Sequence, residues 1–158
     1  MIFGNKELFA IEAYLTQGKN SVFMQYCYWI RDSRVGELDQ YMLLSPTVDN
    51  FNQIIRHQGE RSVAFASSDI NKLMNLLIEL YNDSALININ YSKGENMDGY
   101  VTYLIETESY DWLVCKDTIL NRIHNIKIPK NQFYTQVKNL LFWIRESTAL
   151  VLKGNYTD

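Results

Sequence analysis

The sequence is poor in the residues on which covalent and metal chemistry depend. It contains 2 cysteines and 2 histidines among 158 residues. No Cys-x-x-Cys pair or Cys/His cluster of the zinc-binding kind is present. Cys27 and Cys115 each lie in an apolar, strand-like run, which predicts buried free thiols and a reducing compartment. We therefore expect no metal site and no cofactor.

Glycine is also scarce. The 7 glycines are scattered singly, so the chain lacks a glycine-rich loop for phosphate groups. The motifs of serine hydrolases, P-loop nucleotidases, zinc proteases and dinucleotide-binding enzymes are absent as well. We expect no catalytic residues. The alternative is a small cytosolic hydrolase or nucleotide-modifying enzyme that uses His57 or His124 beside a carboxylate.

Long apolar runs are missing too. The opening residues MIFGNKELFAIEAYL are interrupted by Lys6 and Glu7, where a secretory signal would stay apolar. No segment reaches the ~18 apolar residues of a membrane helix. A net charge of -3 argues against a broad phosphate-binding face. These features predict a cytoplasmic protein without direct nucleic-acid or membrane binding.

What the sequence does contain is the pattern of a single α+β domain over residues 1–158. Short turns between strands favour antiparallel pairing. The expected order is βββ–αα–βββ–α, mainly an antiparallel sheet of about six strands with about three helices packed on one face. Strands are expected at residues 8–15, 22–30, 35–44, 85–91, 100–109 and 110–117, and helices at 45–59, 67–81 and from about 129 to 152.

Charge is segregated along the chain. Residues 95–117 carry six carboxylates against Lys116 alone, whereas residues 122–158 have a net charge of +4. Carboxylates interleaved with aromatic side chains suit contact with a basic protein surface, because aromatics anchor and charges steer. The alternative is that the fold neutralises these charges internally. The residues predicted to contact a partner are Glu37, Asp39, Tyr41, Glu106, Glu108, Tyr110, Asp111 and Trp112.

Several short motifs occur in a characteristic order. They are MIFGNKELFAIEAYL, FMQYCYWIRDSRVGELD, IIRHQGERSVAFASSDINKLMNLL and MDGYVTYLIETES, which together cover most of residues 1–117. This order resembles family forty-two of the immunity proteins of bacterial polymorphic-toxin systems. Met97 and Tyr100 stand where that family has two aromatic residues.

The resemblance implies a cytosolic antitoxin without enzymatic activity. Such a protein binds the toxic C-terminal domain of a cognate effector, often in contact-dependent growth inhibition, and a 1:1 complex is expected. These toxins are frequently nucleases, so the resemblance favours occlusion of the active site or of substrate access. Binding away from the active site is the alternative, and self-association stays open.

Overall fold

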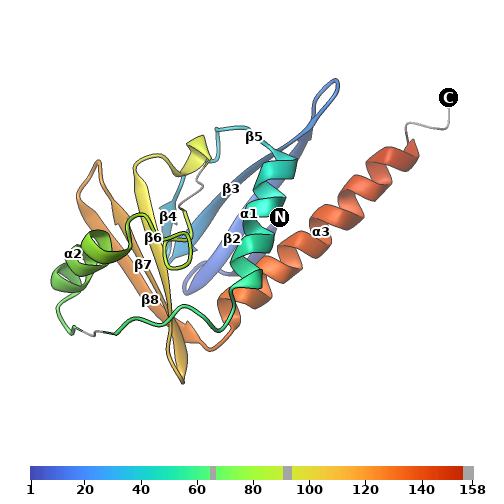
Figure 1. Ribbon diagram of the computed structural model, residues 1–158. Coiled ribbons are helices and arrows are strands. Elements are labelled where there is room, and N and C mark those ends of the chain that lie inside the picture. Colours follow the sequence, from blue (N-terminus) through green and yellow to red (C-terminus); the bar gives the residue numbers. More distant parts are fainter. Residues whose placement is uncertain (65–66, 91–93, 155–158) are drawn as a thin grey trace.

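The computed structural model describes residues 1–64, 67–90 and 94–154, without the side chains of residues 150–154. In its first sheet, β3 is the central strand, paired with β2 on one edge and with both β4 and β5 on the other (Figure 1). All pairs are antiparallel. The strands are β1 (Ile2–Asn5), β2 (Phe9–Gln17), β3 (Val22–Ile30), β4 (Ser33–Val35) and β5 (Met42–Leu43).

A second antiparallel sheet has the order β6–β7–β8. Its strands are β6 (Tyr100–Glu106), β7 (Tyr110–Asp117) and β8 (Arg122–Pro129). The helices are α1 (Leu44–Arg56), α2 (Ile70–Tyr81) and α3 (Gln132–Gly154), with a short 3-10 helix, η1, at Glu95–Met97. Within the described residues, none of the helices combines the length and apolarity needed to cross a membrane.

The α+β class and the antiparallel pairing predicted from the sequence are confirmed. Strand β3 has the predicted limits, and β6, β7, α2 and α3 lie where the sequence placed them. The strands divide between two sheets, however, and the helices between two cores. Helices α1 and α3 pack in the first core and α2 packs in the second. Both faces of the second sheet are therefore buried.

Some predicted elements are wrong. Residues 35–44 form no continuous strand, because Gly36 turns the chain with a positive φ of 100° and a Cβ there would lie 2.9 Å from the Met97 sulfur. Residues 85–90 make only a bridge between Asn88 and Tyr103, and residue 91 lies outside the described residues. Strands β1 and β8 were not predicted, and His124 lies in β8.

The first core lies between the first sheet, the inner face of the second sheet, α1 and α3. Alternate residues of β2 and β3 point into it, as the two-residue period of a strand requires. Phe9 of β2 stacks on Phe133 of α3, with ring centroids 5.3 Å apart. Tyr26 of β3 meets Phe51 of α1 edge-on at 5.1 Å. Aromatic packing thus fixes both helices on this sheet.

The second core lies on the other face of the second sheet, under α2. Leu73, Met74 and Leu77 of α2 are fully buried there. The helix begins at Asp69, whose carboxylate accepts hydrogen bonds from the backbone N–H groups of Asn71 (2.9 Å) and Lys72 (3.2 Å).

Candidate functional site

The two histidines lie in different elements, His57 at the end of α1 and His124 in β8. His57 follows the last residue of α1, and its Nδ1 lies 2.7 Å from Glu60 Oε2. The two side chains are 40% and 57% exposed, so the pair lies in solvent at a helix end. His124 stands in β8 opposite Cys115 of β7. Among the described residues, no group of three or more His, Cys, Asp or Glu side chains is placed to hold a metal ion.

The cysteines are unsuited to nucleophilic chemistry. Cys27 and Cys115 are free and fully buried. Burial raises the pKa of each thiol to about 12, so the reactive thiolate is rare at neutral pH. The hydroxyl of Thr102 also donates to the Cys115 sulfur at 3.3 Å. The predicted free, buried thiols are therefore confirmed.

Glu106, predicted as a contact residue, is 8% exposed and belongs to a buried cluster. Arg61 is 0% exposed, and its Nη1 donates to the Tyr134 hydroxyl at 2.7 Å and to the His57 carbonyl at 2.7 Å. The Tyr134 hydroxyl in turn donates to Glu106 Oε1, which lies 3.8 Å from Arg61 Nη1. This Arg61–Tyr134–Glu106 cluster joins the segment after α1 to α3 and β6.

Asp111, also predicted as a contact residue, is 0% exposed. Its Oδ2 accepts a hydrogen bond from the Asn131 backbone N–H at 2.7 Å, and its Oδ1 lies 3.4 Å from Lys130 Nζ. Burial raises the pKa of Asp111, and the Asn131 hydrogen bond and Lys130 counteract that rise. Internal partners thus neutralise Glu106 and Asp111, as the alternative interpretation of the charge pattern predicts.

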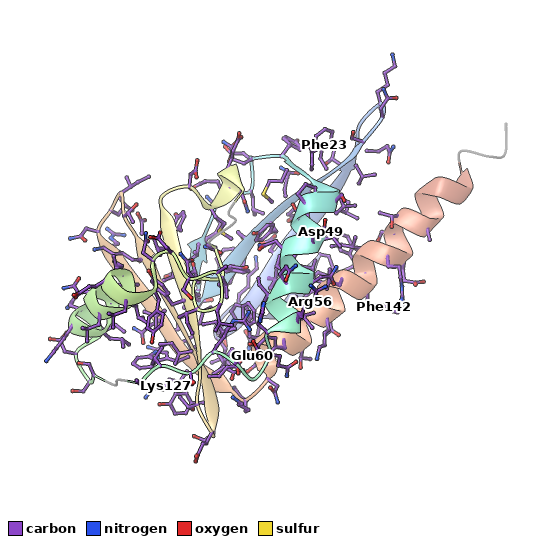
Figure 2. The ribbon with its side chains drawn as sticks, viewed as in Figure 1. Phe23, Asp49, Arg56, Glu60, Lys127 and Phe142 are labelled. Atoms are coloured by element: carbon purple, nitrogen blue, oxygen red, sulfur yellow. The ribbon has the colours of Figure 1, made fainter. Side chains whose placement is uncertain are left out.

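The other predicted residues of the β6–β7 hairpin reach the surface beside a lysine. Glu108 is exposed in the turn, and Tyr110 and Trp112 are half-buried on β7. Lys127 of β8 lies over both rings, 4.7 Å from the Tyr110 centroid and 4.9 Å from that of Trp112. Figure 2 labels this lysine. The hairpin surface is therefore of mixed charge, and not acidic.

Carboxylates do gather at the opposite end of the second sheet. The loop between β4 and β5 packs on η1, because the Glu37 backbone N–H donates to the Asn96 carbonyl at 2.7 Å. Buried Asn96 donates to the Tyr26 carbonyl at 2.7 Å, which fixes η1 on β3. Tyr41 is 57% exposed beside them. We call this surface the acidic end; among the described residues it carries four carboxylates and a tyrosine, Glu37, Asp39, Tyr41, Glu95 and Asp98, against one cation, Arg34.

The acidic end and the hairpin are separate surfaces. Strand β6 starts next to η1 and runs to the hairpin, and its 7 residues span about 20 Å. The predicted contact residues thus fall into two groups at opposite ends of one strand. Arg34 Nη2 lies 3.5 Å from Glu37 Oε2, but these side chains are 48% and 46% exposed, so solvent screens this pair.

The outer face of the first sheet is ordered by a buried carboxylate. Glu12 is 7% exposed, and its oxygens accept from Lys6 Nζ at 2.7 Å, the Tyr14 hydroxyl at 2.6 Å and Trp29 Nε1 at 2.8 Å. Lys6 Nζ also lies 3.9 Å from the centroid of the Trp29 ring. Every one of these groups has its partner within the cluster, which therefore serves the sheet itself.

A surface that sequence reasoning missed lies between α1 and α3. It is a groove of about 860 Å³, which we call the α1–α3 groove. The run of apolar residues 140–144 could have indicated it, since one buried stripe of a helix does not need five in a row. Phe142, labelled in Figure 2, lies on the outer side of that run. Helix α3 contributes Lys138, Leu141, Phe142, Ile144, Arg145 and Thr148.

Comparisons with known proteins agree with the fold and with the sequence motifs. A solved structure of CdiI from Burkholderia dolosa AUO158 is similar, with a TM-score of 0.66 and 16% sequence identity, over 89% of this chain and 98% of that chain. At this identity the likeness shows the shared fold. A comparison with curated proteins found no match.

The family is shown by a match along the chain. The family model described as immunity protein 42 matches residues 1–143, which include both sheets, α1, α2 and the first half of α3. The matched range includes His57 and His124, and membership of this family indicates an inhibitor and not the small hydrolase considered as the alternative. The chain therefore belongs to the immunity protein 42 family, and its function is to neutralise a cognate toxin.

Proposed function

We propose that this immunity protein acts in the cytoplasm, where it forms a 1:1 complex with the catalytic domain of a nuclease toxin. Its fold neighbour CdiI is a contact-dependent inhibition immunity protein, and the same context is proposed for this chain. The observation that carries the nuclease proposal is the acidic end. Its four carboxylates, Glu37, Asp39, Glu95 and Asp98, reach the surface, and the first three lie near the exposed Tyr41.

A nuclease cleft is basic because it has to hold phosphate groups. Carboxylates that enter such a cleft take the place of the substrate's phosphates and exclude the substrate. Opposite charges also steer the two proteins together and raise the association rate. Inhibition by this route blocks the active site or substrate access without any chemistry by the inhibitor.

The proposed contacts centre on Glu37, Asp39 and Tyr41. Tyr41 supplies an aromatic anchor that is 57% exposed in the free protein. At the hairpin, Glu108, Tyr110 and Trp112 stay a secondary proposal, because Lys127 shares that surface. Glu106 and Asp111 are left out of the proposed contacts, since both are buried.

The test uses charge reversal with a matched control. The pair Glu37→Lys and Asp39→Lys should weaken binding of the toxin domain encoded by the adjacent reading frame by at least about tenfold, mainly through slower association. The control pair, Glu7→Lys and Glu79→Lys, changes the net charge equally at exposed positions of the β1–β2 turn and α2.

Both pairs should keep the wild-type melting temperature, and only the first should fail to rescue growth when it is coexpressed with the toxin. Higher salt should weaken the wild-type complex as well. Equal affinities for the two pairs would contradict the acidic-end proposal. Digestion of DNA or RNA by the free toxin tests the nuclease assignment, and sedimentation of the complex tests the 1:1 ratio.

A further inference from the structure

We infer that the α1–α3 groove receives a short amphipathic helix of the toxin, with apolar residues that fill the groove and carboxylates beside them. The inference rests on the proposed function only in that the partner is the toxin. It concerns a different surface from the acidic end. It also requires negative charge on the toxin, where the acidic end requires positive charge. The two can therefore fail independently.

The lengths of the two helical walls of the groove fit a short helix. The residues of α3 that line it recur at helical spacing from Lys138 to Thr148, which is about 15 Å along the axis. On the opposite wall, α1 contributes a stripe from Leu44 to Asn52, about 12 Å long. Two helical walls of this length accommodate two to three turns of a third helix, as in other complexes where a helix lies in a groove.

The groove exposes large apolar side chains that the fold itself does not cover. Phe142 is 58% exposed and Leu43 is 53% exposed. Ile144, at the base of the same wall, is 5% exposed. The second half of α3 runs out beyond the sheets and away from α1 (Figure 1), so the fold leaves apolar side chains of the groove uncovered. Exposed apolar residues beside a hollow are typical of binding surfaces.

Charge identifies the occupant. Among the described residues that line the groove, Lys138 and Arg145 are cations and none is a carboxylate. Lys138 Nζ is held by Gln58 Oε1 at 3.0 Å, and the Arg145 guanidinium lies 5.2 Å from the centroid of the Phe142 ring. Arg145 also lies 3.5 Å from Glu146, but both side chains are more than half exposed. Each cation therefore stays available to a carboxylate of the partner.

The groove adjoins the acidic end across the start of α1. Leu43 and Pro46 line the groove on one side, and on the other side they line a hollow shared with Tyr41 and Glu95. One toxin domain can therefore contact both surfaces at once, with a basic region on the acidic end and an acidic helix in the groove. Negative charge on one surface and positive charge on the other also fix the orientation of the bound toxin.

The distal wall of the groove lies beyond the part shared with the family. The family model ends at residue 143, whereas Ile144, Arg145 and Thr148 continue the wall. Of these residues, Ile144 belongs to the first core, Arg145 is exposed and Thr148 is half-buried.

The experiment measures affinity for the toxin domain encoded by the adjacent reading frame. Leu43→Ser with Phe142→Ser should weaken binding about 30-fold, as expected for the loss of apolar anchors. The matched control, Leu80→Ser with Ile119→Ser, changes residues of 57% and 79% exposure on α2 and after β7, and should bind as wild type. A charge pair, Lys138→Glu with Arg145→Glu, should weaken binding about tenfold, and Lys72→Glu with Arg122→Glu is its control.

Hydrogen exchange on the wild-type complex gives a second readout that needs no variant: amides at residues 141–149 should exchange more slowly when the toxin is bound. Wild-type affinity of the groove variants, or no added protection, overturns the inference. If only the acidic-end variants weaken binding, the proposed function stands and the groove is not used. If only the groove variants do, the reverse holds. A free chain that sediments as a dimer, and becomes monomeric in the Leu43→Ser, Phe142→Ser variant, would assign the groove to a second copy and overturn the inference as well.

Discussion

Replacing Glu106 with alanine should lower the free energy of unfolding and leave the proposed toxin-binding surfaces unchanged. The side chains of Arg61 and Glu106 are 1% and 5% exposed, so the variant would leave Arg61 as a buried cation without its carboxylate. The Tyr134 hydroxyl would also lose its acceptor. Breaking a buried pair by removing one partner costs about 3–5 kcal/mol.

That loss is large against the stability of a domain. A protein of this size has a free energy of unfolding of about 5–15 kcal/mol. With a denaturant slope of about 2 kcal/mol per molar urea, a loss of 4 kcal/mol lowers the unfolding midpoint by about 2 M. In a thermal scan the same loss lowers the melting temperature by roughly 10 °C.

The assay is urea unfolding, followed by fluorescence and by circular dichroism. Glu108→Ala is the matched control in the same hairpin; its side chain is exposed, and its free energy of unfolding should stay within about 0.5 kcal/mol of wild type. Replacing both Arg61 and Glu106 with apolar residues should recover part of the loss, because no unpaired charge is then buried. A wild-type midpoint for Glu106→Ala, together with weaker toxin binding, would refute this reasoning and put Glu106 at the interface.

Two further predictions concern titration and reactivity. Burial would raise the pKa of Glu12, but its three hydrogen-bond donors outweigh burial and lower the pKa from 4.5 to about 2. The stabilising contribution of the Glu12 carboxylate is thus present above pH 4.5 and lost as the pH falls toward 2. The difference in urea midpoint between wild type and Glu12→Gln should therefore close over that range. A difference that does not change with pH would contradict this prediction. Cys27 and Cys115 should react with a thiol reagent at pH 8 at least about 100-fold more slowly in the native protein than in urea, and rapid native labelling would contradict their burial.

Elements with a strong local pattern were predictable from the sequence. Strand β3 is apolar on both faces, and α2 carries an apolar stripe at helical spacing, so each has its type fixed by its own residues. Strand β8 was missed because Arg122, Asn125 and Lys127 make it polar, and it becomes a strand only by pairing with β7. The strand expected over residues 35–44 fails where Gly36 turns against Met97, a contact between distant segments.

Contacts between distant segments also limit what the sequence says about the binding surface. Glu106 and Glu108 are identical in type and two residues apart, yet one is buried against Arg61 and the other lies in solvent. Their environments are set by the segment after α1 and by α3, which are distant in sequence. The acidic end has the same origin, since it forms only because η1 packs on the loop that holds Glu37. Charge patterns along the chain give the residue types of an interface and not their exposure.

The second sheet forms a wall of both cores, with Leu104 and Leu113 facing one and Tyr103 and Val114 facing the other. Neither core can open without exposing a face of this sheet, so the two are expected to melt in one cooperative transition. Amides in the middle of β6 and β7 are therefore expected to exchange only through global unfolding. Both proposed toxin surfaces are therefore carried on a scaffold that is expected to unfold as one unit.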